Sequence, residues 1–155
     1  MEFLRNKGYT KLLATISYIL IDNFSYLFYG KSGSESFRNF SDKYIVPKIK
    51  SEVSSDEMWE DRNGILHNGN HLSFKVKQGK ESALYHTIGN IKELKEFDVI
   101  QKVMLDSKPI DVYDLSKECV LAMKSVLHDT LMSGDLERFM SNFESIPYKP
   151  FQIQN

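Results

Sequence analysis

Apolar residues recur at helical spacing over most of the chain. Over 9–29 they fall three and four positions apart, which predicts one long helix with a single apolar stripe. The same spacing predicts a helix over 37–50 that Pro47 stops or kinks, because proline lacks a backbone donor. A second long helix is expected over 114–132, with Asp114 as its cap, and a shorter one over 135–143.

Another helix is predicted over about 55–68. Ser54 and Glu57 have the spacing of a capping box, in which each side chain bonds the other residue's backbone N–H. The acidic residues of the first turn suit the positive end of a helix. Gly69 is expected to end the helix in a left-handed conformation.

The pattern changes from helical to strand-like after this helix. Residues 72–77 alternate apolar and polar, and 83–88 can return as a second strand after the turn QGKES. We therefore expect a small β-hairpin inserted at about 72–88. Residues 110–113 alternate again, whereas 97–105 are compatible with either a strand or a helix.

The predicted elements make a mainly helical protein, and the length suits one domain over 1–155 with a core that needs no disulfides. Cys119 is the single cysteine and lies in an apolar stripe, so we expect an inert core thiol. Polar residues such as Asp22 interrupt the apolar stretch 16–28, and no signal-peptide pattern is visible. The expectation is a cytoplasmic protein without a membrane contact, with an extended tail over about 146–155.

Charge and residue spacing limit the kinds of binding site that we expect in this chain. The formal net charge of −1 argues against a broad nucleic-acid-binding face, so any RNA contact must be local. The four histidines show no HExxH spacing, and no phosphate-binding glycine motif is present. We therefore expect neither a metal site nor a cofactor.

The stretch RNGILH, residues 62–67, gathers groups with catalytic potential. In a helix Asn63 and His67 lie on one face, and the long side chain of Arg62 can curve toward His67. A histidine can transfer a proton near neutral pH, and an arginine suits phosphate oxygens. Together they are the minimum for cleaving RNA without a metal, by removing the 2′-hydroxyl proton and stabilising the phosphate.

Gly64 interrupts this helix. Glycine costs a helix interior about 1 kcal/mol relative to alanine. Its presence suggests that a second backbone or a ligand comes close there.

The sequence DRNGILHNG, residues 61–69, resembles the signature of the HEPN superfamily, in which an arginine, a polar residue, three more residues and a histidine stand near a helix end. The resemblance implies an antiparallel helical bundle that forms a homodimer, with two motif helices facing each other across one cleft. It also implies a metal-independent endoribonuclease of a toxin–antitoxin, abortive-infection or anti-phage system, with a possible cognate antitoxin or defence-system partner.

By the same resemblance, Arg62 and His67 would be catalytic, and Asn63 would orient or bind the substrate. An acidic residue on an earlier helix often supports such a site. Asp22 is a candidate for that role, and Glu60 or Asp61 are alternatives.

Two other hypotheses stay open. The same fold could be a module without catalysis that binds RNA, a nucleotide or a protein partner, which the near-neutral charge favours. Alternatively, Arg62 and His67 could serve only as a structural helix end. Side chains that point inward with satisfied partners would favour the structural hypothesis, and side chains that face a cleft would favour function.

Overall fold

The structure, a computed structural model, describes residues 7–69, 73–89 and 107–146. Its elements in chain order are α1 (Lys7–Tyr29), α2 (Ser34–Tyr44), α3 (Ser55–Asn68), α4 (Phe74–Lys77), β1 (Ala83–Thr87), β2 (Ser107–Asp111), α6 (Val112–Ser133) and α7 (Leu136–Glu144). The predicted mainly helical class is therefore confirmed. The predictions for 97–105 and for the tail beyond residue 146 lie outside the described residues.

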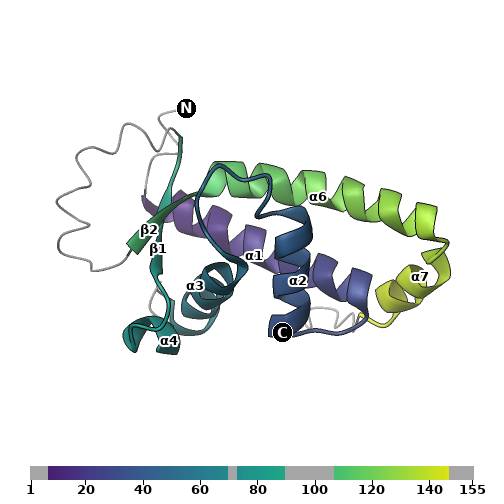
Figure 1. Cartoon of the computed structure of the whole chain (residues 1–155), viewed down its shortest axis with the longest axis horizontal. Coiled ribbons are helices and arrows are strands. Elements are labelled where there is room, and N and C mark those ends of the chain that lie inside the picture. The colour runs from purple at the N-terminus through teal and green to yellow at the C-terminus, as the bar shows by residue number, and fades with distance from the viewer. Residues whose placement is uncertain (1–6, 70–72, 90–106, 147–155) are drawn as a thin grey trace, which may run out of the picture.

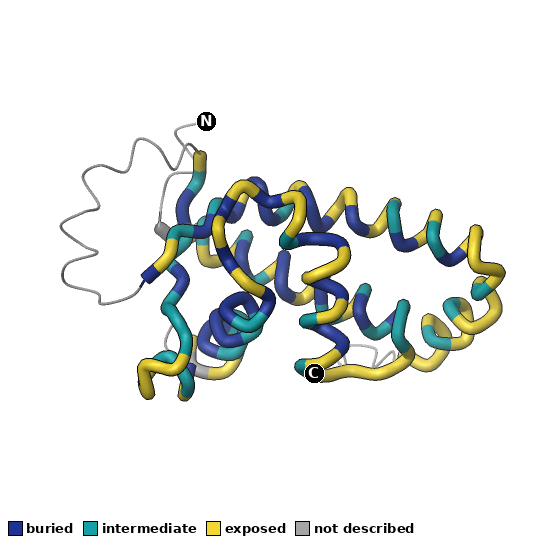
Figure 2. The backbone as a smooth tube through the Cα atoms, in the orientation of Figure 1, coloured by how far each residue is buried: buried dark blue, intermediate teal, exposed yellow. Residues whose placement is uncertain are grey.

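Helix α1 is the centre of the fold. It contacts α6 along much of its length and also contacts α2, α3 and α7 (Figure 1). Its residues Tyr18 and Ile21 are fully buried, as are Phe37 and Phe40 of α2. Burying a large apolar side chain stabilises a fold by about 1.5–3 kcal/mol, so this aromatic cluster anchors α2 to α1. Figure 2 shows the buried positions on the inward faces of these helices.

The ends of α3 match the sequence prediction. The Ser54 side chain accepts a bond from the Glu57 N–H at 3.2 Å, and the Glu57 carboxylate accepts one from the Ser54 N–H at 2.8 Å. Both halves of the capping box are thus present. At the other end Gly69 has φ 66°, the left-handed conformation that glycine adopts at low cost.

Two other helix boundaries differ from the prediction. The cap of α6 is Asp111, whose side chain accepts bonds from the backbone of the first turn. Asp114 lies inside that turn and instead accepts a bond from the Lys50 N–H at 2.9 Å. Helix α2 begins at Ser34 and not at residue 37, and it ends at Tyr44, before Pro47, as the proline predicted.

The predicted hairpin is wrong. Phe74–Lys77 forms the short helix α4, whose first turn is capped by the Ser73 hydroxyl, and Phe74 is 73% exposed. The alternation of this stretch therefore did not reflect burial of one strand face. Strand β1 is present as expected, but it pairs in parallel with β2, with His86 opposite Ile110. Leu72 lies outside the described residues.

The segment Tyr9–Tyr29 of α1 is long and apolar enough to cross a membrane, and an 18-residue window within it has a mean hydropathy of 1.3. This differs from the expectation based on its polar residues. The core helix of a soluble protein passes the same test, however, and α1 supplies Tyr18 and Ile21 to the core. The helix is weak evidence for a membrane contact.

Candidate functional site

Arg62 lies on the face of α3 that runs alongside α1. Its Nε and Nη2 donate to Oδ2 of Asp22 at 2.9 and 2.7 Å. The Arg62 side chain is 18% exposed and that of Asp22 is 26% exposed, so the ion pair lies at the boundary between interior and solvent. The structure thus places one of the three candidate acids, Asp22, against the motif arginine.

The motif histidine joins the same cluster. Arg62 Nη1 donates to Oδ1 of Asn63 at 3.0 Å and contacts Nε2 of the exposed His67 at 3.2 Å. The predicted curvature of the arginine toward the histidine is confirmed. Because arginine can only donate, a hydrogen bond at this contact requires Nε2 of His67 to accept and the ring proton to be on Nδ1. In this arrangement the Arg62 N–H occupies the lone pair of Nε2.

The surroundings of the Asp22–Arg62 ion pair shift the pKa of Asp22 and fix the position of Arg62. Burial raises the pKa of Asp22 above its usual value, and the bonds from Arg62 and its positive charge counter part of that rise, as does the charge of His67 when its ring is protonated. The guanidinium also lies over the ring of Trp59, with 4.9 Å between its central carbon and the ring centroid. Trp59 in turn packs edge-on against the buried Phe37. These contacts fix the plane of the arginine.

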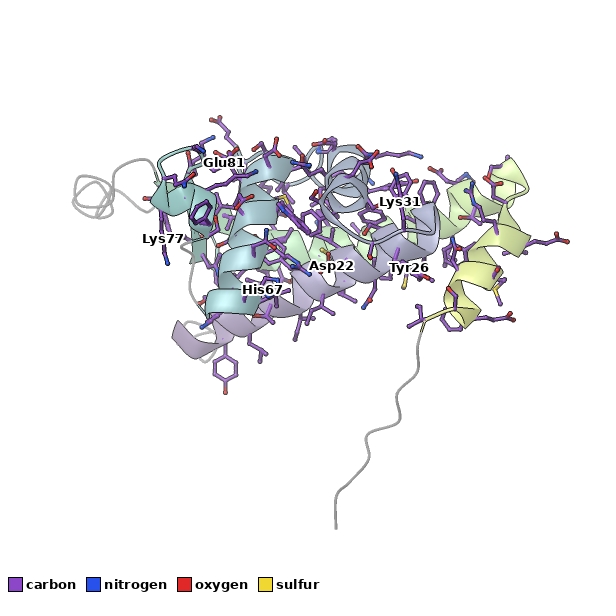
Figure 3. All side chains as sticks on the ribbon, turned by 90° about the horizontal axis from the view of Figure 1, so that it is seen from below. Asp22, Tyr26, Lys31, His67, Lys77 and Glu81 are labelled. Carbon is purple, nitrogen blue, oxygen red and sulfur yellow. The ribbon has the colours of Figure 1, made fainter. Side chains whose placement is uncertain are left out.

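A cleft of about 490 Å³ opens beside this cluster. It is lined by Asp22, Asn23, Tyr26, Ser32, Gly33, Trp59, Arg62 and Ile146. Figure 3 shows Asp22 and Tyr26 on α1, on the same side of the molecule as His67. Sequence reasoning missed Asn23 and Tyr26. Tyr26 lies one helical turn after Asp22 and so shares its face, which was the available signal for Tyr26, whereas the spacing gave none for Asn23.

The other two candidate acids lie elsewhere. Glu60 accepts a bond from Ser73 at 2.7 Å and pairs with Lys75 at 3.1 Å. Asp61 is 1% exposed, and its Oδ2 lies 2.7 Å from the Tyr18 hydroxyl and 2.6 Å from Nε2 of His86. Both side chains point away from the Arg62 cluster and hold α3 against its neighbours.

Gly64 is buried within this single chain. Its burial leaves little surface there for the helix of a second copy or for an RNA strand. The exposed part of the motif is its end, at His67.

The buried thiol of Cys119 lies apart from the site. Burial raises the pKa of the Cys119 thiol to about 12, as expected for an inert core cysteine. Among the residues that the structure describes, no three histidine, cysteine, aspartate or glutamate side chains lie close enough to hold a metal ion.

Comparison of the chain with protein-family models, curated proteins and solved structures gives no match. The resemblance to the HEPN superfamily therefore rests on the motif residues alone.

Proposed function

We propose that this protein is a metal-independent endoribonuclease of HEPN type. The observation that carries the proposal is the contact between Arg62 and His67 with Asp22 behind the arginine. With Arg62 turned from Nε2 toward the phosphate, His67 would remove the proton of a ribose 2′-hydroxyl, and the 2′-oxygen would attack the adjacent phosphorus. The bond from phosphorus to the 5′-oxygen would break, which leaves a 2′,3′-cyclic phosphate, and the 5′-oxygen would take up a proton from the protonated His67 or from water. Arg62 would stabilise the charge that develops on the phosphate oxygens.

A composite site in a homodimer belongs to this proposal. Helix α1 exposes Leu12, Ile16 and Ile19, which are 51%, 45% and 43% accessible. Ile19 lies one helical turn before Asp22, so this apolar strip runs beside the Arg62 cluster. Contiguous exposed apolar residues of this kind mark interaction surfaces. A second copy packed on the strip would bring a second His67 toward the first.

A second candidate function is a binding module without catalysis. Asp22 and Asn63 already occupy several donors of Arg62, and the carboxylate offsets its positive charge. Such an arginine attracts a phosphate less strongly than a free one. The satisfied pairing of Arg62 also agrees with the hypothesis that Arg62 and His67 form only a structural helix end. The exposure of His67 argues against that hypothesis.

The cellular setting extends the same proposal. A ribonuclease of this type would act in the cytoplasm as part of a toxin–antitoxin or anti-phage system. A cognate antitoxin or defence-system protein would then restrain it.

Cleavage of labelled single-stranded RNA tests the proposal. Wild type should cut the RNA with and without a chelator, and His67→Ala should not. Cleavage that persists in the variant, or that disappears with the chelator, would overturn the mechanism. Saturable RNA binding without any cleavage by wild type would support the binding module instead.

The dimer is tested separately by its mass in solution. Ile16→Asp should shift the protein to monomers and lower cleavage with it. Val120→Asp, a matched change at an exposed position of α6, should leave both unchanged. Full cleavage by a monomeric Ile16→Asp protein would rule out the composite site.

A further inference from the structure

The cleft beside Arg62 has the chemistry of a site for a planar, polar ring. Tyr26 and Trp59 supply aromatic surface, and the Arg62 guanidinium adds a flat cationic plane. Asn23 and Ser32 supply groups that can both donate and accept hydrogen bonds. Unstacked RNA bases are recognised by this combination of stacking planes and amide or hydroxyl groups. The volume of about 490 Å³ falls within the usual range for small-molecule sites.

The charges of the cleft decide which part of a nucleotide enters. Asp22 places a carboxylate on its wall, and that carboxylate repels a phosphate. Arg62 lines the cleft and also contacts His67 through Nη1. A phosphate would therefore stay on the His67 side of the guanidinium, while an uncharged base fills the cleft.

The exposure of Asn23 and Ser32 allows them to read the edge of such a base. Both are exposed in the structure, Asn23 on α1 and Ser32 in the link that joins α1 to α2. By contrast the Tyr26 hydroxyl is already bonded to the Ser145 hydroxyl at 2.7 Å. Tyr26 thus offers its ring, and Asn23 and Ser32 offer the hydrogen bonds.

We infer that this cleft is a nucleobase subsite, in which one base of a single-stranded RNA stacks beside Tyr26 and Arg62 and is read by Asn23 and Ser32. The inference rests on the proposed function for the placement of the phosphate. It adds a determinant of where along an RNA the protein binds and cuts.

Binding of uncleavable RNA tests the subsite without relying on catalysis. The probes are 2′-O-methyl pentanucleotides, intact or with a single abasic unit at each position in turn, measured by fluorescence anisotropy on the full chain. Wild type should bind the intact probe about ten-fold more tightly than the probe with the abasic unit at one particular position, as expected for the loss of one stacked base. Equal affinity for all probes would overturn the inference.

Two variants locate the base. Ser32→Tyr fills the cleft from an exposed position, and Asn23→Ala removes the amide. Ser32→Tyr should erase the difference between intact and abasic probes. Asn23→Ala should reduce the preference among homopolymers of the four bases. Asn39→Ala, at an exposed asparagine of α2 away from the cleft, is the matched control and should behave as wild type. Retention of the abasic effect in Ser32→Tyr would place the base elsewhere and overturn the inference.

Adenosine, cytidine, guanosine and uridine monophosphates distinguish a free nucleotide from an RNA chain. Weak binding of a monophosphate that Ser32→Tyr abolishes supports the subsite for either source, and tighter binding of the pentanucleotide identifies RNA as the ligand. These results distinguish failure of the subsite from failure of the ribonuclease proposal. If wild type cuts no RNA but its binding depends on the base, the ribonuclease proposal is wrong and the subsite stands. If wild type cuts RNA but its binding does not depend on the base, the subsite is wrong and the ribonuclease proposal stands.

Discussion

Two clusters on α3 contain almost the same groups and differ in burial. Asp61 and Arg62 are neighbours in sequence, but their side chains leave the helix in different directions. Asp61 joins Tyr18 and His86 in a cluster whose carboxylate is 1% exposed. Arg62 joins Asp22 and His67 beside an open cleft. Each cluster contains an aspartate and a histidine, which contact each other in the first cluster and are bridged by Arg62 in the second. Only the second cluster lies beside an open cleft.

Burial assigns different roles to the two clusters. A buried carboxylate that keeps both of its hydrogen-bonding partners fixes the elements that carry them, here α1, α3 and β1. A partly exposed ion pair contributes little to stability but leaves its groups free to act on a ligand. We therefore expect changes in the buried cluster to appear in the free energy of unfolding, and changes in the open cluster to appear in cleavage.

The largest effect is expected at His67. Replacing it with alanine removes the proposed general base, which contributes about 10²- to 10⁴-fold in rate. Because His67 is exposed, the unfolding midpoint should stay close to that of wild type. Initial rates of RNA cleavage together with urea unfolding measure both quantities. His128→Ala, at an exposed histidine of α6, is the control and should change neither.

The buried cluster should show the opposite result. Asp61→Ala leaves the Tyr18 hydroxyl and the His86 ring without the carboxylate in the interior, which should cost about 3–5 kcal/mol of unfolding free energy. Urea unfolding followed by circular dichroism measures this loss. The milder Asp61→Asn keeps one acceptor and should lie between alanine and wild type. A loss below about 1 kcal/mol for the alanine variant would contradict the anchoring role.

The contrast between the clusters also shows which features could be predicted from the sequence. The capping box, Gly69 and the bounds of α3 follow from local backbone chemistry and were predicted. The contact between Arg62 and His67 follows from helix geometry and was also predicted. The choice of Asp22 over Glu60 was not available, because it depends on how α1 packs against α3.

The features that the sequence did not predict also depend on tertiary packing. Parallel pairing joins β1 to a strand that begins twenty residues after β1 ends, and no local pattern encodes that partner. The cleft combines Tyr26 of α1, Ser32 of the following link and Trp59 of α3. One weak signal existed for Asp61, which follows Met58 by three positions and precedes Ile65 by four, and so occupies a core position of its helix.

Asp22 provides a smaller test that separates binding from catalysis. Asp22→Asn removes a negative charge near the proposed phosphate position and loosens the hold on Arg62. RNA affinity should therefore rise, while the cleavage rate falls by about ten-fold as the arginine loses its fixed position. Because burial raises the pKa of Asp22, this carboxyl takes up its proton at a higher pH than an ordinary aspartate.

The pH dependence of cleavage tests whether the charge of Asp22 acts in the site. As the pH falls through that raised pKa, wild type loses the same charge as the variant, so the ratio of their cleavage rates should approach one. Single-turnover rates of both proteins over a pH series measure the ratio. A ratio that stays constant at every pH would mean that the charge of Asp22 has no part in the site.

The smallest effect is expected at the start of α3, which carries both clusters. Ser54→Ala removes one half of the capping box and should cost about 1 kcal/mol. Burial alone would raise the pKa of Glu57, but bonds from Lys108 and Ser54 lower it below its usual value. Stability from these bonds is therefore present above the unfolded pKa of the glutamate and is lost as the pH falls through the lower folded value.

Glu57→Gln should accordingly flatten the acid side of the stability–pH curve, measured by urea unfolding between acid and neutral pH. Ser125→Ala, within α6, is the control for Ser54→Ala and should give the same stability–pH curve as wild type. Cleavage by both α3 variants at neutral pH should remain near wild type, because the cap lies at the far end of the helix from His67. A loss of cleavage larger than the loss of folded protein would show that the two clusters are coupled through the helix and do not act separately.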